Sequence, residues 1–195
     1  MNSQKKMATS KRIKIGPWGG QGGVPWDDGN YRGILSITLV YDRCINSIRV
    51  EYDKNGRPIL GERHGGSGGR HVIQIKFAYP EEYLTDISGY IAPMVHGGSP
   101  VIRSLRFNTN KQTFGPYGIE EGTPFTIPIE GGMVIGFHGR SSQYLDSIGM
   151  YLSRIHASRI YIYQKMQKLG EKLGHRDGAR GCPYKAGASR DIAAE

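Results

Sequence analysis

The sequence predicts a body that is built entirely from β-strands. Short runs of β-branched residues recur along the chain, as in Ile34–Tyr41, and such runs favour strands over helices. The 29 glycines gather between these runs, where tight turns are expected. No helical spacing of apolar residues precedes about residue 156. A barrel, a sandwich or a prism would each fit this pattern.

The individual strands are predicted from alternation and from the turns that separate them. Ile34–Tyr41 and Ile45–Tyr52 flank a short turn. Asn55-Gly56 follows and predicts a tight hairpin turn, because both residues tolerate positive φ angles. The remaining expected strands are Val72–Phe77, Tyr83–Ile91, Val101–Phe107, Met133–His138 and Ile148–Leu152.

Two glycine-rich loops, Gly19–Gly23 and Gly65–Gly69, are near-copies of each other and predict a pseudo-symmetric fold. They are not phosphate cradles, since neither contains the P-loop motif nor the glycine turn between a strand and a helix that binds dinucleotides. The glycines either supply turns with positive φ or remove side chains so that a ligand can approach bare backbone amides.

The net charge of +9 is concentrated in the two ends of the chain. Residues 1–12 form a basic leader, expected to be disordered and not to be a signal peptide. Residues 154–195 form a basic tail, with helical spacing over Arg159–Leu173 and a sequence typical of disorder after it. The body between them is close to neutral, which argues against nucleic-acid binding. No stretch approaches the ~20 apolar residues of a membrane span.

The residue types that perform catalysis or bind metals form no recognisable site. Cys44 is expected in the core, and with Cys182 it forms no CxxC pair. The six histidines lack metal-ligand spacing, so neither a metal nor a cofactor is expected. Asp27-Asp28 and Glu120-Glu121 are expected in surface turns, because neighbours on a strand point to opposite faces and do not form a glycosidase pair.

The segment Gly139–Asp146 has the composition of a sugar-binding turn between two strands. The Asp146 carboxylate can accept hydrogen bonds from two hydroxyls. The amides of Gln143 and Tyr144 can donate to sugar oxygens, and the Tyr144 ring can pack against the apolar face of a pyranose. On these grounds alone, an aspartate that caps a turn is an equal alternative.

Several segments together resemble the jacalin-related lectins of plants, in family order over roughly residues 13–153. The resemblance implies a β-prism of three four-stranded antiparallel sheets with pseudo-threefold symmetry. It also implies metal-independent sugar binding without enzyme activity. The matching segments are Gly16–Ile34, Tyr52–Gly69, Pro80–Tyr90, Val101–Asn110, Phe114–Phe125, Ile127–Arg140 and Tyr144–Leu152.

The family's sugar site, carried over by position, joins Gly23 to the motif Ser142–Asp146. Asp146 takes the carboxylate role, Gln143 and Tyr144 supply amides, and Leu145 faces the core or the site floor. Ser142 replaces the motif's first glycine, which would cost about 1 kcal/mol if that position required a positive φ.

The second glycine loop, Gly65–Gly69, is expected to lack a sugar site. Some family members carry a sugar site there, to which a segment with acidic residues contributes. In this chain the corresponding segment is Arg43-Cys44-Ile45-Asn46, and the acidic residues are missing.

The chain is similar to the mannose-binding branch of the family, because the linker Gly16–Gly22 runs uninterrupted into Gly23. This branch implies binding of mannose- or glucose-containing glycans by a homo-oligomer in the cytoplasm or nucleus. The alternative is a scaffold module with a weakened sugar site, whose basic tail docks an acidic partner.

Overall fold

Twelve β-strands make up the part of the chain that the structure, a computed structural model, describes: residues 12–129 and 131–154. Residues 1–11 of the basic leader and nearly all of the C-terminal tail, including its expected helix, lie outside these residues, whereas Arg12, the last residue of the expected leader, begins the first strand. The strands are β1 (Arg12–Gly19), β2 (Val24–Asp27), β3 (Gly33–Tyr41), β4 (Ile45–Lys54), β5 (Arg57–Gly65), β6 (His71–Lys76), β7 (Leu84–Pro93), β8 (Pro100–Thr109), β9 (Thr113–Gly118), β10 (Thr123–Pro128), β11 (Gly132–Ser141) and β12 (Leu145–Arg154).

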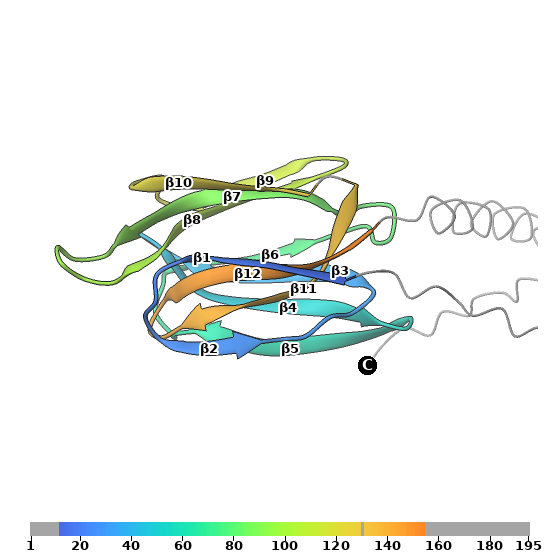
Figure 1. Ribbon diagram of the computed structural model, residues 1–195, viewed down its shortest axis with the longest axis horizontal. Helices are drawn as coiled ribbons and strands as arrows, with labels where there is room; N and C mark the ends of the chain where they lie inside the picture. The colour runs from blue at the N-terminus through green and yellow to red at the C-terminus, as the bar shows by residue number, and fades with distance from the viewer. Residues whose placement is uncertain (1–11, 130, 155–195) are drawn as a thin grey trace, which may run out of the picture. The chain divides into compact units, whose positions relative to one another are not determined.

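The strands form three four-stranded antiparallel sheets, as the resemblance implied (Figure 1). Their orders are β1-β12-β11-β2, β5-β4-β3-β6 and β10-β7-β8-β9. In each sheet a central hairpin lies between two outer strands that a glycine-containing connection joins. The register repeats as well, because Gly19 pairs with Ser147, Gly65 with Ser47 and Gly118 with Ser104. The expected β-prism with pseudo-threefold symmetry is therefore confirmed.

The sequence prediction located the central strands and missed most of the outer ones. All six central strands were expected, although β12 begins at Leu145 rather than at residue 148. Five outer strands, β1, β2, β5, β9 and β10, were not expected. They are mostly exposed, and each contains glycine or proline, which weakens or shortens the apolar alternation that marks a half-buried strand.

Two local predictions hold in detail. Asn55 and Gly56 have φ angles of 59° and 84° and connect β4 to β5, which is the two-residue turn that matches the twist of a hairpin. Cys44 is buried, and burial raises the pKa of its thiol to about 11. This cysteine therefore behaves as a small core residue.

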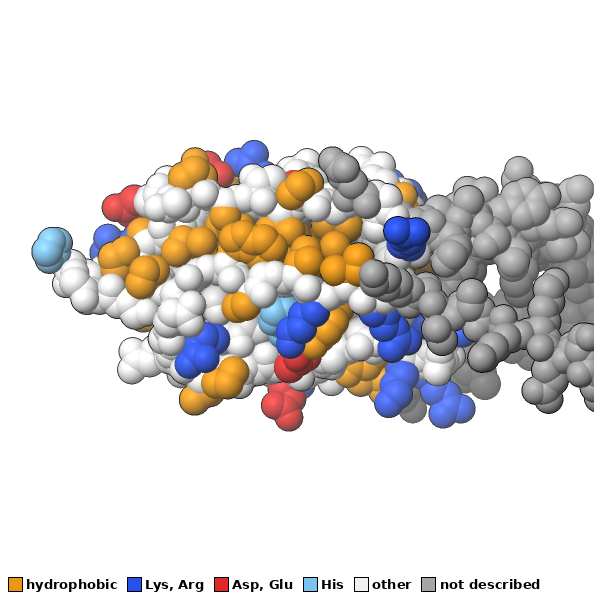
Figure 2. All heavy atoms as spheres, in the orientation of Figure 1, with side chains coloured by type: hydrophobic (Ala, Val, Ile, Leu, Met, Phe, Trp, Pro, Cys, Tyr) orange, Lys and Arg blue, Asp and Glu red, His pale blue; other side chains and the backbone are white. Residues whose placement is uncertain are grey.

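One hydrophobic core fills the space between the three sheets. Its largest side chains, Tyr52, Phe107 and Phe137, have no exposed surface, and burying each aromatic side chain contributes roughly 1.5–3 kcal/mol. Where two sheets meet, hydrophobic side chains also reach the surface: Figure 2 shows such a band between β1 and the sheet that contains β7 and β8. Within the described residues, no helix has the length and apolar character needed to cross a membrane.

Candidate functional site

The site motif lies in the turn that connects β11 to β12. The two strands extend further than the sequence predicted and leave a turn of only three residues, Ser142-Gln143-Tyr144. The Ser142 amide donates a hydrogen bond to the Tyr144 carbonyl, with an N···O distance of 2.9 Å. Asp146 therefore lies on β12, and the rigid sheet fixes its position more firmly than a loop would.

The first glycine loop lies directly against Asp146. The Gly20 amide donates to the Asp146 carbonyl at 2.8 Å. A Cβ atom added at Gly22 would lie 2.5 Å from Asp146 Oδ1, and one added at Gly23 would lie 2.7 Å from Oδ2. Gly23 also has a φ of +63°, which side-chain-bearing residues rarely adopt. Glycine is thus required here so that bare backbone can approach the carboxylate.

The Asp146 carboxylate has little contact with solvent and an unused acceptor. Asp146 is 3% exposed, and among the described residues its Oδ2 is buried without a hydrogen-bond donor. A buried acceptor without a partner costs about 1–3 kcal/mol, and more when it is charged. A ligand that donates hydrogen bonds to this oxygen would remove that cost, which makes Asp146 the strongest chemical feature of the site.

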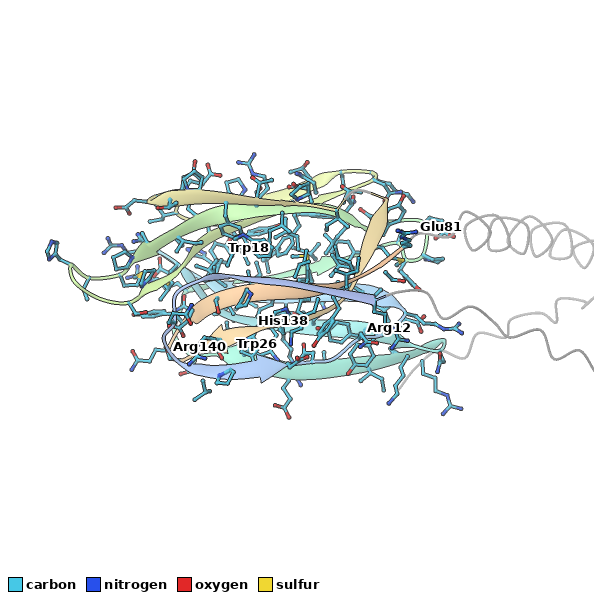
Figure 3. All side chains as sticks on the ribbon, viewed as in Figure 1. Arg12, Trp18, Trp26, Glu81, His138 and Arg140 are labelled. Carbon is cyan, nitrogen blue, oxygen red and sulfur yellow. The ribbon has the colours of Figure 1, made fainter. Side chains whose placement is uncertain are left out.

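Arg140 holds the glycine loop in place. Its Nε donates to the Gly22 carbonyl at 2.9 Å, and one terminal nitrogen donates to the Gly23 carbonyl at 2.7 Å. Figure 3 shows Arg140 at the end of the sheet where the chain passes from β1 to β2. Arg140 lies within the segment considered from sequence, but no role was assigned to it, because pairing between β11 and β2 brings the two parts together.

The other expected site residues next to Asp146 differ in how far they are exposed to solvent. Ser142 and Gln143 are exposed, Tyr144 is half-buried, and Leu145 is fully buried in the core. The two possibilities for Leu145 are therefore resolved in favour of the core. Among the described residues, Asn55 is the one non-glycine with a positive φ. Ser142 thus adopts an ordinary φ, and the expected cost of replacing glycine does not arise.

Two further connections reach the same end of the prism, and sequence reasoning assigned neither to the site. The Ser99 hydroxyl, from the connection between β7 and β8, would lie 3.2 Å from a Cβ at Gly22. In the second glycine loop, a Cβ at Gly66 would lie 2.5 Å from the Gln143 carbonyl oxygen. No local sequence signal marks these contacts, because both depend on the packing of separate sheets.

The pseudo-threefold symmetry supplies two counterparts of Asp146. In each sheet one serine, Ser147, Ser47 or Ser104, pairs with the last glycine of an outer strand. The residue before that serine is Asp146 in one sheet, Asn46 in the second and Arg103 in the third. Asn46 Oδ1 is buried without a donor among the described residues, and it would lie 2.8 Å from a Cβ at Gly69. Arg103 is buried and donates to Glu121 at 2.7 Å and to the Pro93 carbonyl, so a side chain of the protein itself fills the third position.

The adjacent carboxylate pairs have partners within the protein. Asp27 accepts hydrogen bonds from Lys14 and Tyr151. Burial opposes ionisation of Asp27, but these bonds outweigh it and lower its pKa to about 2. Glu120 and Glu121 bind Arg106 and Arg103.

Asp28 departs from the surface-turn prediction. Its side chain is 6% exposed and accepts hydrogen bonds from Tyr52 and His64, each at 2.6 Å. Within the described residues, no three His, Cys, Asp or Glu side chains are grouped so that they could hold a metal ion.

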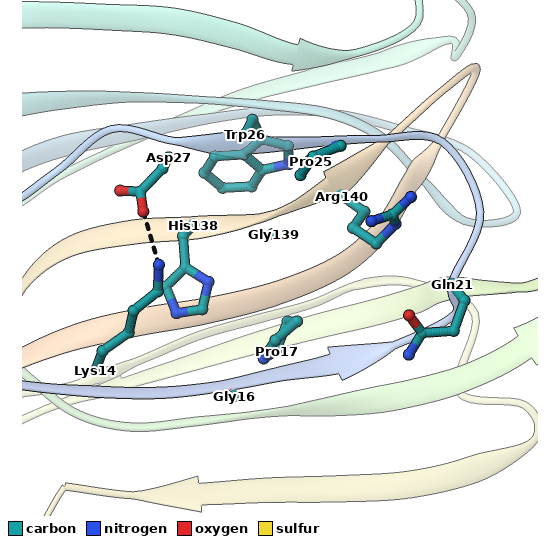
Figure 4. A pocket seen from close by; sticks show the side chains of 10 residues that line it. All are labelled: Lys14, Gly16, Pro17, Gln21, Pro25, Trp26, Asp27, His138, Gly139 and Arg140. Carbon is teal, nitrogen blue, oxygen red and sulfur yellow. Dashed lines mark hydrogen bonds and ion pairs between the residues drawn. The ribbon is translucent and has the colours of Figure 1, made fainter.

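A shallow pocket of about 480 Å³ lies on the outer face of the β1-β12-β11-β2 sheet (Figure 4). Trp26 and Pro25 line one side, and His138 lies beside the ion pair of Lys14 and Asp27. His138 is buried and bonds the Ile15 carbonyl at 3.0 Å. Burial, together with nearby Lys14, lowers its pKa. The His138 bond ties β1 to β11 and the Lys14–Asp27 pair ties β1 to β2, so both serve the packing of the sheet.

Comparison with known proteins agrees with this geometry. Residues 15–151 match the jacalin-like lectin domain. The chain is 54% identical over 173 residues to jacalin-related lectin 19 of Arabidopsis thaliana, covering 89% of this chain and 96% of that protein. This chain belongs to the jacalin-related lectins. It is therefore a carbohydrate-binding protein and not an enzyme.

Solved structures of related lectins have the same fold. A mannose-specific jacalin-related lectin from Morus nigra, in complex with mannose, matches this lectin with a TM-score of 0.70 and 46% identity, covering 76% of this chain and 99% of that one. A complex of artocarpin with mannopentose matches with a TM-score of 0.71 and 47% identity, covering 74% and 99%. The sheets that carry Asp146 and the glycine loop are thus those of a sugar-binding family.

Proposed function

We propose that this lectin binds mannose- or glucose-type sugars, without a metal ion, between the Gly20–Gly23 loop and the segment Ser142–Asp146. The observation that carries this proposal is the buried Asp146 Oδ2, which lacks a donor among the described residues and lies beside bare glycine backbone. A sugar hydroxyl has the donor that this oxygen needs, and adjacent hydroxyls can use both carboxylate oxygens.

The remaining groups of the site would complete recognition of one sugar ring. The amides of Gln143 and Tyr144 are proposed as donors to ring or hydroxyl oxygens, and the Tyr144 ring is proposed to pack against an apolar sugar face. The preference for mannose is supported by the mannose-specific lectins among the solved relatives. The continuous connection from β1 to β2, which Arg140 holds at Gly22 and Gly23, also supports it.

Isothermal titration calorimetry tests this proposal with methyl α-mannoside and methyl α-galactoside, each with and without EDTA. We expect the mannoside to bind, the galactoside to bind at least tenfold more weakly, and EDTA to leave both affinities unchanged. A preference for the galactoside, or loss of mannoside binding in EDTA, would contradict the assignment.

Useful avidity is proposed to come from a homo-oligomer. A site with few hydrogen bonds competes poorly with water, whereas several linked sites can raise the overall affinity by roughly 10²–10⁴-fold. Light scattering coupled to size-exclusion chromatography gives the oligomeric state. A monomer would contradict this part of the proposal without affecting the single-site measurement above.

A further inference from the structure

A groove begins at the sugar site and follows the junction between β2 and β5. It has a volume of about 870 Å³, which lies within the range of ligand pockets. Gly23, Ser141 and Ser142 line it at the site end. β5 lines the groove along its length, from Gly65, beside the second glycine loop at the site end, to Ile59. The groove is therefore continuous with the place where the terminal sugar is proposed to bind.

The base of this groove is held by packing between two sheets. The Trp26 ring, from β2, stacks on the His64 ring, from β5, with a centroid distance of 3.9 Å. His64 also bonds the Asp28 carboxylate at 2.6 Å, and Tyr31 stacks on Tyr52 at 4.3 Å. These contacts fix the two strands relative to each other. The groove is thus present before any ligand binds, which reduces the ordering cost of binding.

The walls combine apolar and polar surface. Val24, Ile59 and Leu60 are exposed large hydrophobic residues, whereas Glu62 and Arg63 carry opposite charges. Gly61 and Gly65 leave backbone uncovered. Aliphatic surface can cover the C–H faces of sugar rings, and charged or backbone groups can bind their hydroxyls. The charged side chains of the groove lining are Asp27, Asp28, Glu62 and Arg63, and with His64 counted as neutral they leave a formal charge of −2. This charge would repel a nucleic acid or an acidic peptide, so an uncharged glycan fits better.

We infer that this groove binds the rest of an oligosaccharide whose terminal sugar occupies the Asp146 site. The inference rests on the proposed function and extends it. The continuity of the groove with the site selects a glycan as the occupant. The other occupant to consider is a second copy of this chain, which could pair with the exposed edges of β2 or β5.

The test compares a monosaccharide with an oligosaccharide in groove variants. Leu60→Arg replaces a side chain that is 55% exposed, and Arg63→Ala removes a donor, so neither change disturbs the core. The matched control is Val72→Arg. Val72 is 67% exposed and lies on β6, the other outer strand of the same sheet. Calorimetry measures binding of methyl α-mannoside and of a linear mannopentaose by the full chain.

We expect the wild-type lectin to bind mannopentaose at least fivefold more tightly than methyl α-mannoside. Leu60→Arg should remove this preference and Arg63→Ala should reduce it, while monosaccharide affinity stays within twofold. Val72→Arg should change neither affinity. A wild-type protein without the preference, or Leu60→Arg with the preference intact, would overturn the inference. Failure of the wild type to bind the monosaccharide would instead count against the proposed function.

Light scattering on the same variants tests whether a second copy of this chain, rather than a glycan, occupies the groove. If Leu60→Arg lowers the oligomeric state and leaves the oligosaccharide preference unchanged, the groove is an interface between copies and the glycan assignment is wrong. If the oligomeric state is unchanged and the preference is lost, the glycan assignment holds.

Discussion

Replacing Asp146 by alanine separates the two roles that a buried aspartate can have, ligand binding and structural support. In this lectin, Asp146 Oδ2 has no donor among the described residues. A structural aspartate would instead be held by donors from the protein itself, as Asp28 is by Tyr52 and His64. Asp146→Ala should therefore abolish sugar binding and leave the fold intact.

The expected magnitudes follow from the two carboxylate oxygens. A hydrogen bond to a charged group contributes about 1.5–3 kcal/mol, so two of them contribute about 3–6 kcal/mol. Because each 1.4 kcal/mol changes affinity tenfold, the variant should bind roughly 10²–10⁴-fold more weakly. Stability should not fall, since removing a buried acceptor without a partner relieves a penalty of about 1–3 kcal/mol.

Retention on a mannose column and thermal unfolding together provide the assay. Asp146→Asn, which keeps the side-chain size and one acceptor oxygen, should show an intermediate loss of binding. Asp42→Ala, at the equivalent turn between β3 and β4, is the matched control and should leave retention unchanged. Unaltered retention of Asp146→Ala would refute the site assignment. A fall in its melting temperature of more than about 4 °C, equivalent to roughly 1 kcal/mol, would refute the claim that the carboxylate lacks a structural role.

Three further predictions concern the same sheets. Gly23→Ala should weaken mannoside binding at least tenfold in calorimetry, with an unchanged circular dichroism spectrum, because the positive φ costs about 1–2 kcal/mol and the added Cβ would displace the loop by meeting the Ser141 carbonyl and the Asp146 carboxylate. Asp27, whose pKa falls from 3.8 to about 2 on folding, stabilises the fold above this range and loses that contribution as the pH drops through it. Urea unfolding should therefore show a smaller loss of stability between pH 4 and pH 2 in Asp27→Asn than in the wild type; an equal loss would contradict the pairing with Lys14. Asn46→Asp should raise the calorimetric stoichiometry for mannoside from one to two per chain, and a value that stays at one would show that the second glycine loop cannot form a site.

The sequence predicted the central hairpins well because each of these strands packs against the core. Ile34–Tyr41 and Ile45–Tyr52 carry the apolar residues that fill the prism. Five of the six outer strands escaped prediction for the opposite reason. In β9, for example, Gly115 and Pro116 occupy the middle of the strand, and what holds it is its pairing with β8 rather than its own pattern.

The candidate site was predictable only in part. The residues of the Gly139–Asp146 segment suggested a sugar site, but Gly23 entered through the resemblance, and an aspartate that caps a turn was an equal alternative. The structure adds the approach of Gly22 and Gly23 to the Asp146 carboxylate and the two bonds from Arg140. These contacts join residues about 120 positions apart in the chain, and the pairing of β11 with β2 and of β12 with β1 brings them together.

The three pseudo-equivalent positions explain why one sheet carries the proposed site. All three stand in the same register beside a glycine-containing connection, so the fold supplies the backbone geometry three times. The side chain then decides the chemistry. Arg103 occupies its position by bonding Glu121 and two carbonyls, and Asn46 has one acceptor oxygen but no charge. Asp146 alone among the three can accept from two hydroxyls with a full negative charge, which is the property that sugar recognition requires.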